Sequence, residues 1–280
     1  MPFPLAHPAA VLPLRRYCPR LFNFPALVIG SLCPDIGYCF GRFHIAEFSH
    51  RFLAGSFGFC LPVGLLLLLI FYLARWPVVQ RLPARQRRIF EPLCLRPAGS
   101  FLLIVISLLL GAWTHLFLDS VTHENGWLVE HLPAVFQADV AAGNFHVRVY
   151  NGLYAGCTFV GATYVALAYL NWLERAAGTP GWFLQGFKWV ITLAFATLTL
   201  LLSFVNHNSS SSLGLVAVGV LTAMLVAGFF AVTDWGLRNA GSRLAETYQG
   251  KAGAQRAASI LTANSATVGE SNKSCNGSSI

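Results

Sequence analysis

The sequence contains few charged residues, and this scarcity excludes an ordinary soluble protein. Asp, Glu, Lys and Arg make up 11% of the 280 residues, whereas a soluble domain carries about 25%. Hydrophobic residues account for 55%, and they include long apolar runs such as LPVGLLLLLIFYLA at 61–74. The composition therefore predicts an all-α, polytopic helical protein that is integral to a membrane.

Common catalytic and binding motifs are also missing from the sequence. There is no CxxC pair, no phosphate-cradling glycine loop, no GxSxG and no HExxH, which argues against a zinc finger, a nucleotide-binding loop, a serine-hydrolase elbow and a zinc-protease helix. We expect the seven cysteines to be small buried residues without disulfides. The net charge of +8 comes largely from arginines between apolar runs. It therefore reports membrane topology, and we expect no nucleic-acid partner.

Five apolar segments have the roughly 20 residues that a helix needs to cross a bilayer. They are 52–74, 98–118, 152–173, 184–206 and 213–236. A sixth segment, 21–40, is shorter, is interrupted by prolines and contains Asp35. It is compatible with a span, a broken span or a re-entrant segment. These segments predict a helical membrane domain over 1–238.

The polar residues outside the apolar segments predict a tail and an orientation. Residues 239–280 are small and polar, and we expect them to be disordered because they cannot bury a core. The 75–97 segment holds six arginines and one glutamate, which places it in the cytoplasm by the positive-inside rule. The 119–151 segment would then lie outside, and the C-terminus would be cytoplasmic.

Ligand-type side chains occur at the end of the second long apolar segment, in GAWTHLFLDSVTHENGW. His115 and Asp119 are one helical turn apart and share a face, and a neutral imidazole with a carboxylate suits Zn²⁺ or Mn²⁺. In the expected topology, His50 and Asp35 lie at the same outer face. The pattern predicts a divalent metal site, most simply for zinc, with Thr122 and His123 as supporting groups or an additional ligand.

A simpler interpretation is that these residues only mark the polar end of a span. An isolated HxxxD motif would favour that interpretation. Asp35 favours the metal site instead, because an acid within an apolar segment is costly and indicates a function. Asp35 or Asp119 would alternatively serve as a general base.

Five blocks of the sequence resemble a bacterial family of membrane proteins known as domain of unknown function 4184. They are MPFPLAHPAAVLPLRR, FPALVIGSLCPDIGY, FSHRFLAG, GAWTHLFLDSVTHENGW and VYNGLYAGCTFVGA. The order of a His, a Pro-Asp, a Ser-His and a His-x-x-x-Asp is also similar to the broader YdjM-like group of inner-membrane metal-dependent hydrolases. The resemblance implies a bacterial inner-membrane location. It nominates five metal ligands: His7, Asp35, His50, His115 and Asp119.

The sequence departs from the broader group in two blocks. Pro34-Asp35 continues as Ile36-Gly37 without a further polar ligand, and the Ser-His block has lost one histidine. One metal ion is therefore expected in place of two. His7 also conflicts with the topology. If six segments cross, His7 lies on the cytoplasmic side, away from the other four ligands. If 21–40 is re-entrant, His7 joins them but Arg15, Arg16 and Arg20 would lie on the wrong side.

Two classes of function follow from these features. The first is a membrane-embedded, metal-dependent hydrolase that acts on an ester or phosphoester at the membrane–water boundary, where a lipid or lipid-linked substrate would be met. The alternative is a non-enzymatic membrane protein, either an ion- or proton-coupled transporter or a structural component. A relay should extend polar groups through the bilayer, and the later apolar segments contain few of them.

Overall fold

The computed structural model describes residues 6–18, 21–39, 43–142, 145–178, 181–208 and 220–236. It divides into two units, Met1–Asp234 and Trp235–Ile280. The second unit lies almost wholly outside the described residues, as does the expected disordered tail 239–280. The architecture below is that of the first unit.

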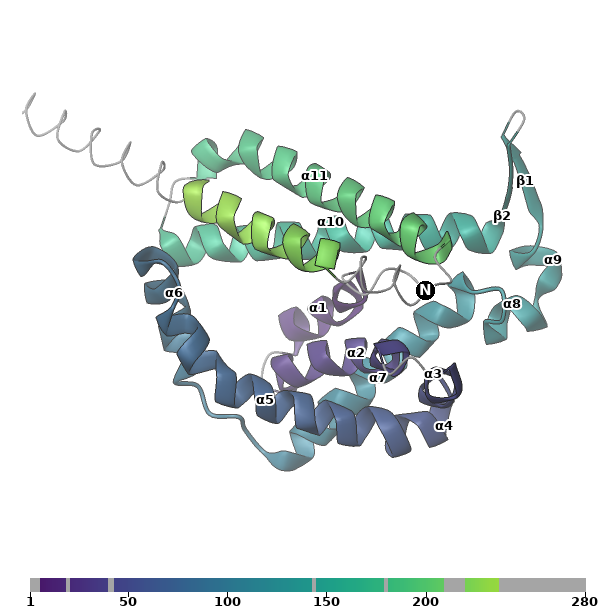
Figure 1. Ribbon diagram of the computed structural model, residues 1–280, viewed down its shortest axis with the longest axis horizontal. Coiled ribbons are helices and arrows are strands. Elements are labelled where there is room, and N and C mark those ends of the chain that lie inside the picture. Colours follow the sequence, from purple (N-terminus) through teal and green to yellow (C-terminus); the bar gives the residue numbers. More distant parts are fainter. Residues whose placement is uncertain are drawn as a thin grey trace, which may run out of the picture. The chain divides into compact units, whose positions relative to one another are not determined.

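The fold is all-α apart from one short hairpin, as the composition predicts (Figure 1). The helices are α1 (Pro8–Tyr17), α2 (Phe24–Cys39), α3 (Phe43–Ser49), α4 (Phe52–Gly55), the π-helix η2 (Ser56–Cys60), α5 (Leu61–Gln80), α6 (Ala84–Cys94), α7 (Phe101–Thr122), α8 (Trp127–His131), α9 (Pro133–Phe136), α10 (Val149–Ala177) and α11 (Gly181–Asn208). A further helix covers Val220–Gly236. Strands β1 (Asp139–Ala142) and β2 (Phe145–Arg148) pair antiparallel.

Three of the described helical stretches are long and apolar enough to cross a membrane: Phe52–Gln80, Phe101–His131 and Val149–Ala177. They correspond to the first three expected spans. The shorter apolar helices are Phe24–Tyr38, Lys188–Leu202 and Val220–Gly236. The expected span at 213–236 begins outside the described residues, so five spans remain a prediction.

Segment 21–40 forms one helix in spite of its prolines. Helix α2 has 16 residues and keeps Pro34 inside it, and at 1.5 Å per residue it is about 24 Å long, short of a hydrocarbon core of about 30 Å. The arginine-rich 75–97 segment contains α6, and the 119–151 segment contains α8, α9 and the hairpin. Both segments are therefore more ordered than simple loops.

Helices α2 and α7 pack closely because two glycines face their contact. A Cβ at Gly30 would overlap the carbonyl oxygen of Leu108, and a Cβ at Gly111 would overlap that of Leu27. Small residues at helix interfaces let backbones approach within a membrane. The approach holds the C-terminal half of α2 against the C-terminal half of α7, where the candidate ligands lie.

Asn23 holds the turn between α1 and α2 at the opposite end of this pair. Its side-chain oxygen accepts a hydrogen bond from the Ala26 N–H (2.9 Å), which caps α2. Its backbone N–H donates to Ser107 Oγ (2.9 Å) and its side-chain nitrogen donates to Tyr72 (3.0 Å). Since the chain reverses here, the start of α1 and the end of α2 lie at the same end of the bundle.

Candidate metal centre

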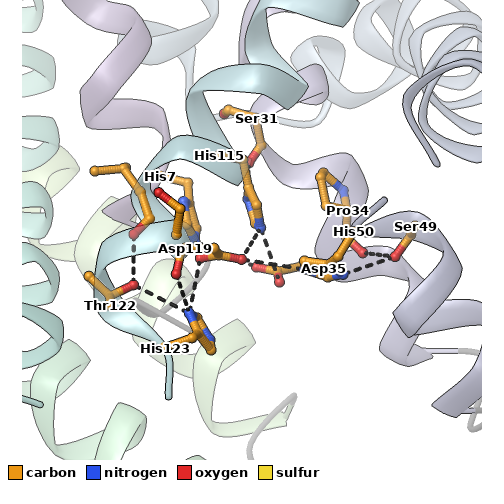
Figure 2. Close-up of polar contacts among 12 residues, drawn as sticks. His7, Ser31, Pro34, Asp35, Ser49, His50, His115, Asp119, Thr122 and His123 are labelled. Atoms are coloured by element: carbon orange, nitrogen blue, oxygen red, sulfur yellow. Dashed lines mark hydrogen bonds and ion pairs between the residues drawn. The ribbon is translucent and has the colours of Figure 1, made fainter. Parts of the chain in front are cut away.

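Five side chains gather between α1, α2, α7 and the turn after α3 (Figure 2). His7 precedes α1, Asp35 lies near the end of α2, and His50 follows α3. His115 and Asp119 project from one face of α7, one turn apart, and both are buried. These are the five ligands that the sequence nominates, and the structure brings all of them together.

The nitrogens and oxygens of these side chains face one another across short distances. His115 Nε2 lies 3.1 Å from Asp119 Oδ2 and 3.6 Å from Asp35 Oδ1. His50 Nε2 lies 3.4 Å from Asp119 Oδ2. His7 Nε2 lies 3.8 Å from Asp35 Oδ2 and 4.0 Å from Asp119 Oδ1. Atoms that bind one ion at about 2.0–2.2 Å are separated by distances of this order.

Backbone carbonyls orient two of the imidazoles. His115 Nδ1 lies 2.8 Å from the Ser31 carbonyl oxygen, and His50 Nδ1 lies 2.7 Å from that of Ala46. Since a carbonyl only accepts, Nδ1 carries a proton in each ring, and Nε2 keeps its lone pair when the ring is neutral. This arrangement typically orients metal-ligating histidines. It leaves two nitrogen lone pairs directed at the carboxylates.

Close backbone contacts bring the segments that carry His50 and His7 into the site. A Cβ at Gly37 would lie 2.7 Å from Ser49 Oγ, so this glycine lets α3 approach α2. Ser49 Oγ donates to the Pro34 carbonyl (2.9 Å), which ties the residue before His50 to the residue before Asp35. On α10, a Cβ at Gly161 would lie 2.9 Å from Ala6, so this glycine makes room for the residue before His7.

The site is closed on one side and open on the other. The side chains of His7 and His115 are fully buried, and their rings stack with centroids 3.8 Å apart. His50 and His123 are 21% and 28% exposed, and Tyr38 is 40% exposed with its ring edge on His50. The partly exposed side chains of the site are therefore those of His50, His123 and Tyr38.

The donor set fits a divalent metal. The carboxylate oxygens of Asp35 and Asp119 and Nε2 of His50 and His115 are buried, and none has a partner in hydrogen-bonding geometry among the described residues. Two groups, His7–Asp35–His115 and His50–His115–Asp119, each offer atoms within 4.8 Å of one another. Two carboxylates in a buried site repel each other unless a cation or protons compensate them. A divalent ion supplies that compensation and binds the same atoms.

The position of His7 corrects the expectation that six crossings would keep His7 away from the other four ligands. Helix α1 runs from His7 at the site to Arg15, whose guanidinium lies over the Phe24 ring, 4.2 Å from its centroid. Partial burial and nearby Arg96 lower the pKa of Arg15. Arg15 thus lies near Arg96 of the 75–97 segment, whereas His7 lies near the opposite end of α2, beside Asp35. The sequence reasoning assumed that both residues share one side, because it read α1 as a flank and not as part of the bundle.

Thr122 and His123 lie beside the five ligands, as expected for supporting groups. His123 Nδ1 is 3.6 Å from Asp119 Oδ1 and 3.2 Å from the Asp119 carbonyl, and Thr122 Oγ1 is 3.3 Å from His123 Nδ1. The sequence analysis missed Tyr38, which stands one turn after Asp35 at the open side. Its spacing of three residues from Asp35 was the signal that could have found it.

Comparison with known proteins identifies a family and nothing beyond it. A family model described as a domain of unknown function (DUF4184) matches residues 1–233, which span every nominated ligand. No curated protein and no solved structure matches the chain. The more distant resemblance to the YdjM-like group stays a prediction. By this match over most of its length, the chain belongs to the DUF4184 family.

Proposed function

We propose that this protein is a membrane-embedded, metal-dependent hydrolase that cleaves an ester or phosphoester at the membrane–water boundary. The observation that carries the proposal is the pair of imidazoles whose Nδ1 atoms are held by the Ser31 and Ala46 carbonyls while their Nε2 atoms face buried carboxylates. A structural helix end has no need for two oriented lone pairs in a buried acidic site.

The residues of this chain have distinct roles in the proposal. His7, Asp35, His50, His115 and Asp119 supply the ligands for divalent metal, for which zinc is the first candidate. Such an ion, when bound, makes water a stronger nucleophile and polarises a carbonyl or phosphoryl oxygen. Asp35 or Asp119 accepts a proton when not fully engaged by the ion. His50, His123 and Tyr38 border the side from which substrate enters.

A membrane location supports a lipid or lipid-linked substrate. The site includes the C-terminal part of α7, at Asp119, which lies within the candidate span Phe101–His131, close to where its polar continuation begins. In the proposed topology all five long apolar segments cross a bacterial inner membrane, 75–97 and the C-terminus are cytoplasmic, and the site opens to the outer face. An ester or phosphate near a lipid headgroup would lie at the depth of the site.

The test is hydrolysis by the detergent-purified protein, with metal content measured on the same sample. The probes are a soluble p-nitrophenyl ester, a soluble p-nitrophenyl phosphate, and a phosphorylated lipid in mixed micelles. We expect metal-dependent turnover of at least one probe, lost in Asp119→Asn and in His115→Ala. His131→Ala is the matched control because His131 is exposed and bonds only the carbonyl one turn before it, that of Trp127, among the described residues. A metal-loaded protein that hydrolyses none of the three probes would contradict the proposed hydrolase activity.

A further inference from the structure

The two carboxylates of the site each present their two oxygens in different directions. Asp119 turns Oδ2 toward His50 and His115 and Oδ1 toward His7 and His123. Asp35 turns Oδ1 toward His115 and Oδ2 toward His7. One oxygen of each carboxylate therefore faces the His50–His115 side, and the other faces the His7 side. Carboxylates that bridge two metal ions have this orientation.

The ring planes separate His7 from His115. An imidazole binds a metal in its own ring plane, because the nitrogen lone pair lies in that plane. The rings of His7 and His115 are stacked 3.8 Å apart with only 20° between their planes. Planes so nearly parallel meet far beyond a metal–nitrogen distance of about 2.0–2.1 Å. The two nitrogens therefore cannot bind the same ion without leaving the stack.

His50 and His115 are arranged differently. Their rings are tilted by 58° with centroids 5.7 Å apart, so the two ring planes meet much closer to the nitrogens. Both Nε2 atoms also face the same atom, Asp119 Oδ2, at 3.4 Å and 3.1 Å. His115 can serve only one ion, because its Nδ1 is engaged with the Ser31 carbonyl. It therefore belongs with His50.

A single ion would also leave part of the site uncompensated. All four carboxylate oxygens are buried, and none has a partner in hydrogen-bonding geometry among the described residues. One ion bound by one oxygen of each carboxylate leaves the other two oxygens with only the longer contacts to His7 and His123, at 3.6–4.0 Å, and a buried polar atom without a hydrogen bond is costly. Two ions engage all four oxygens.

We propose that the site is binuclear: Asp35 and Asp119 bridge two divalent ions, with His50 and His115 on one ion and His7 on the other. The spacing of the stacked rings matches the separation of about 3.5–4 Å that is usual for two-metal hydrolytic sites. This arrangement departs from the single ion that was expected because the sequence differs from the YdjM-like group. The missing histidine of the Ser-His block is not required in this arrangement, because the bridging carboxylates supply two ligands to each ion.

The binuclear site narrows the substrate class of the proposed hydrolase, on which this step rests. Two divalent ions carry four positive charges, and Asp35 and Asp119 with neutral histidines compensate two of them. The remaining positive charge favours an anionic substrate, and a phosphoryl group can place one oxygen on each ion. We therefore assign the site to a phosphoester in preference to a neutral carboxylic ester.

The test is the number of ions bound, measured without reference to turnover. The full chain is purified in detergent, loaded with Mn²⁺, freed of excess ion, and analysed for manganese per chain and by electron paramagnetic resonance. We expect two ions per chain and the exchange-coupled spectrum of a Mn²⁺ pair. One ion with the spectrum of isolated Mn²⁺ overturns the binuclear site and leaves the proposed metal-dependent function standing. No bound ion overturns both.

Variants assign the two ions to their ligands. His7→Ala should retain one ion and lose the coupled spectrum, because it removes the imidazole assigned to the other ion. His50→Ala removes one of the two imidazoles assigned to its ion and should weaken the binding of that ion. His44→Ala is the control for His50, because His44 is exposed on helix α3, which ends just before His50, and it should retain the pair. If His7→Ala retains two coupled ions, the assignment of His7 is overturned. The wild-type spectrum decides the nuclearity even if a variant fails to fold.

Inorganic phosphate and acetate test the substrate class on the Mn²⁺-loaded wild-type protein. Phosphate should alter the coupled spectrum at concentrations at which acetate does not, and equal effects of the two anions overturn the preference for phosphoryl groups. A soluble phosphate monoester and a phosphorylated lipid in mixed micelles then distinguish the sources of that group. Competition with phosphate by the lipid alone indicates a headgroup substrate, and competition by both indicates a site open to soluble phosphoesters.

Discussion

The imidazole of His7 lies face to face with that of His115, with ring centroids 3.8 Å apart and 20° between the planes. Neither side chain is exposed. The contact joins the segment before α1 to the C-terminal half of α7 and buries one side of the candidate metal centre. Because α1, α2 and α7 meet at this point, occupancy of the site should be coupled to the stability of the bundle.

Chelation should lower the thermal stability of the protein in detergent. A ligand that binds only the folded state stabilises it, by about 2.7 kcal/mol when free metal is a hundred times its Kd. We expect the apparent Tm to fall by several degrees with a chelator and to recover when Zn²⁺ or Mn²⁺ is restored. Asp119→Asn should show neither change, while Asp139→Asn, at an exposed position of β1, should respond as the wild type does. An equal chelator response in Asp119→Asn would argue against the site.

Gly111→Ala should destabilise the bundle and weaken metal binding together. A Cβ at Gly111 would overlap the Leu27 carbonyl, and forcing α2 from α7 separates Asp35 from His115. Overpacking of this kind costs about 1–3 kcal/mol. The control is Gly152→Ala on α10, where a Cβ meets nothing within 4 Å. Thermal unfolding and metal titration of both variants check the prediction, and unchanged metal affinity in Gly111→Ala would contradict it.

Asn23→Ala should lower stability while leaving the number of bound ions unchanged. The substitution removes the cap of α2, worth about 0.5–2 kcal/mol, together with the side-chain bond to Tyr72. Asn23 lies at the opposite end of α2 from Asp35, so the ligands keep their positions. Asn125→Ala, in an exposed turn, serves as the control. Loss of metal at temperatures where the variant remains folded would show that the turn also positions the ligands.

The proposed orientation predicts which segments meet the periplasm. In a cysteine-free background, a cysteine at Arg88 should be protected from a membrane-impermeant thiol reagent in intact cells, and a cysteine at Gln137 should be labelled. Both positions are exposed, one on α6 and one after α9. The reverse pattern would turn the site toward the cytoplasm and overturn the outer-face location.

Much of the fold could be predicted from the sequence because apolar length and helical spacing are local properties. The run before His115 predicts the long apolar helix α7, and four-residue spacing predicts that His115 and Asp119 share its buried face. The placement of Asp35 and His50 at the same end of the helices as His115 followed from counting how many apolar segments cross the membrane before each residue. Membership of the family was likewise predicted from short blocks of sequence and is confirmed by the match over residues 1–233.

Tertiary structure alone decided how the separate segments meet. The course of α1 depends on the contact of Ala6 with Gly161 and on Asn23 reaching Ser107, and neither contact has a signature in local sequence. The same holds for the Ser31 carbonyl, which sets the tautomer of His115, and for the stacking that separates His7 from it. Sequence spacing determines which side chains share a helix face. Which lone pairs point at which oxygens depends on backbone approaches between helices distant in the chain, and only the packed bundle specifies those.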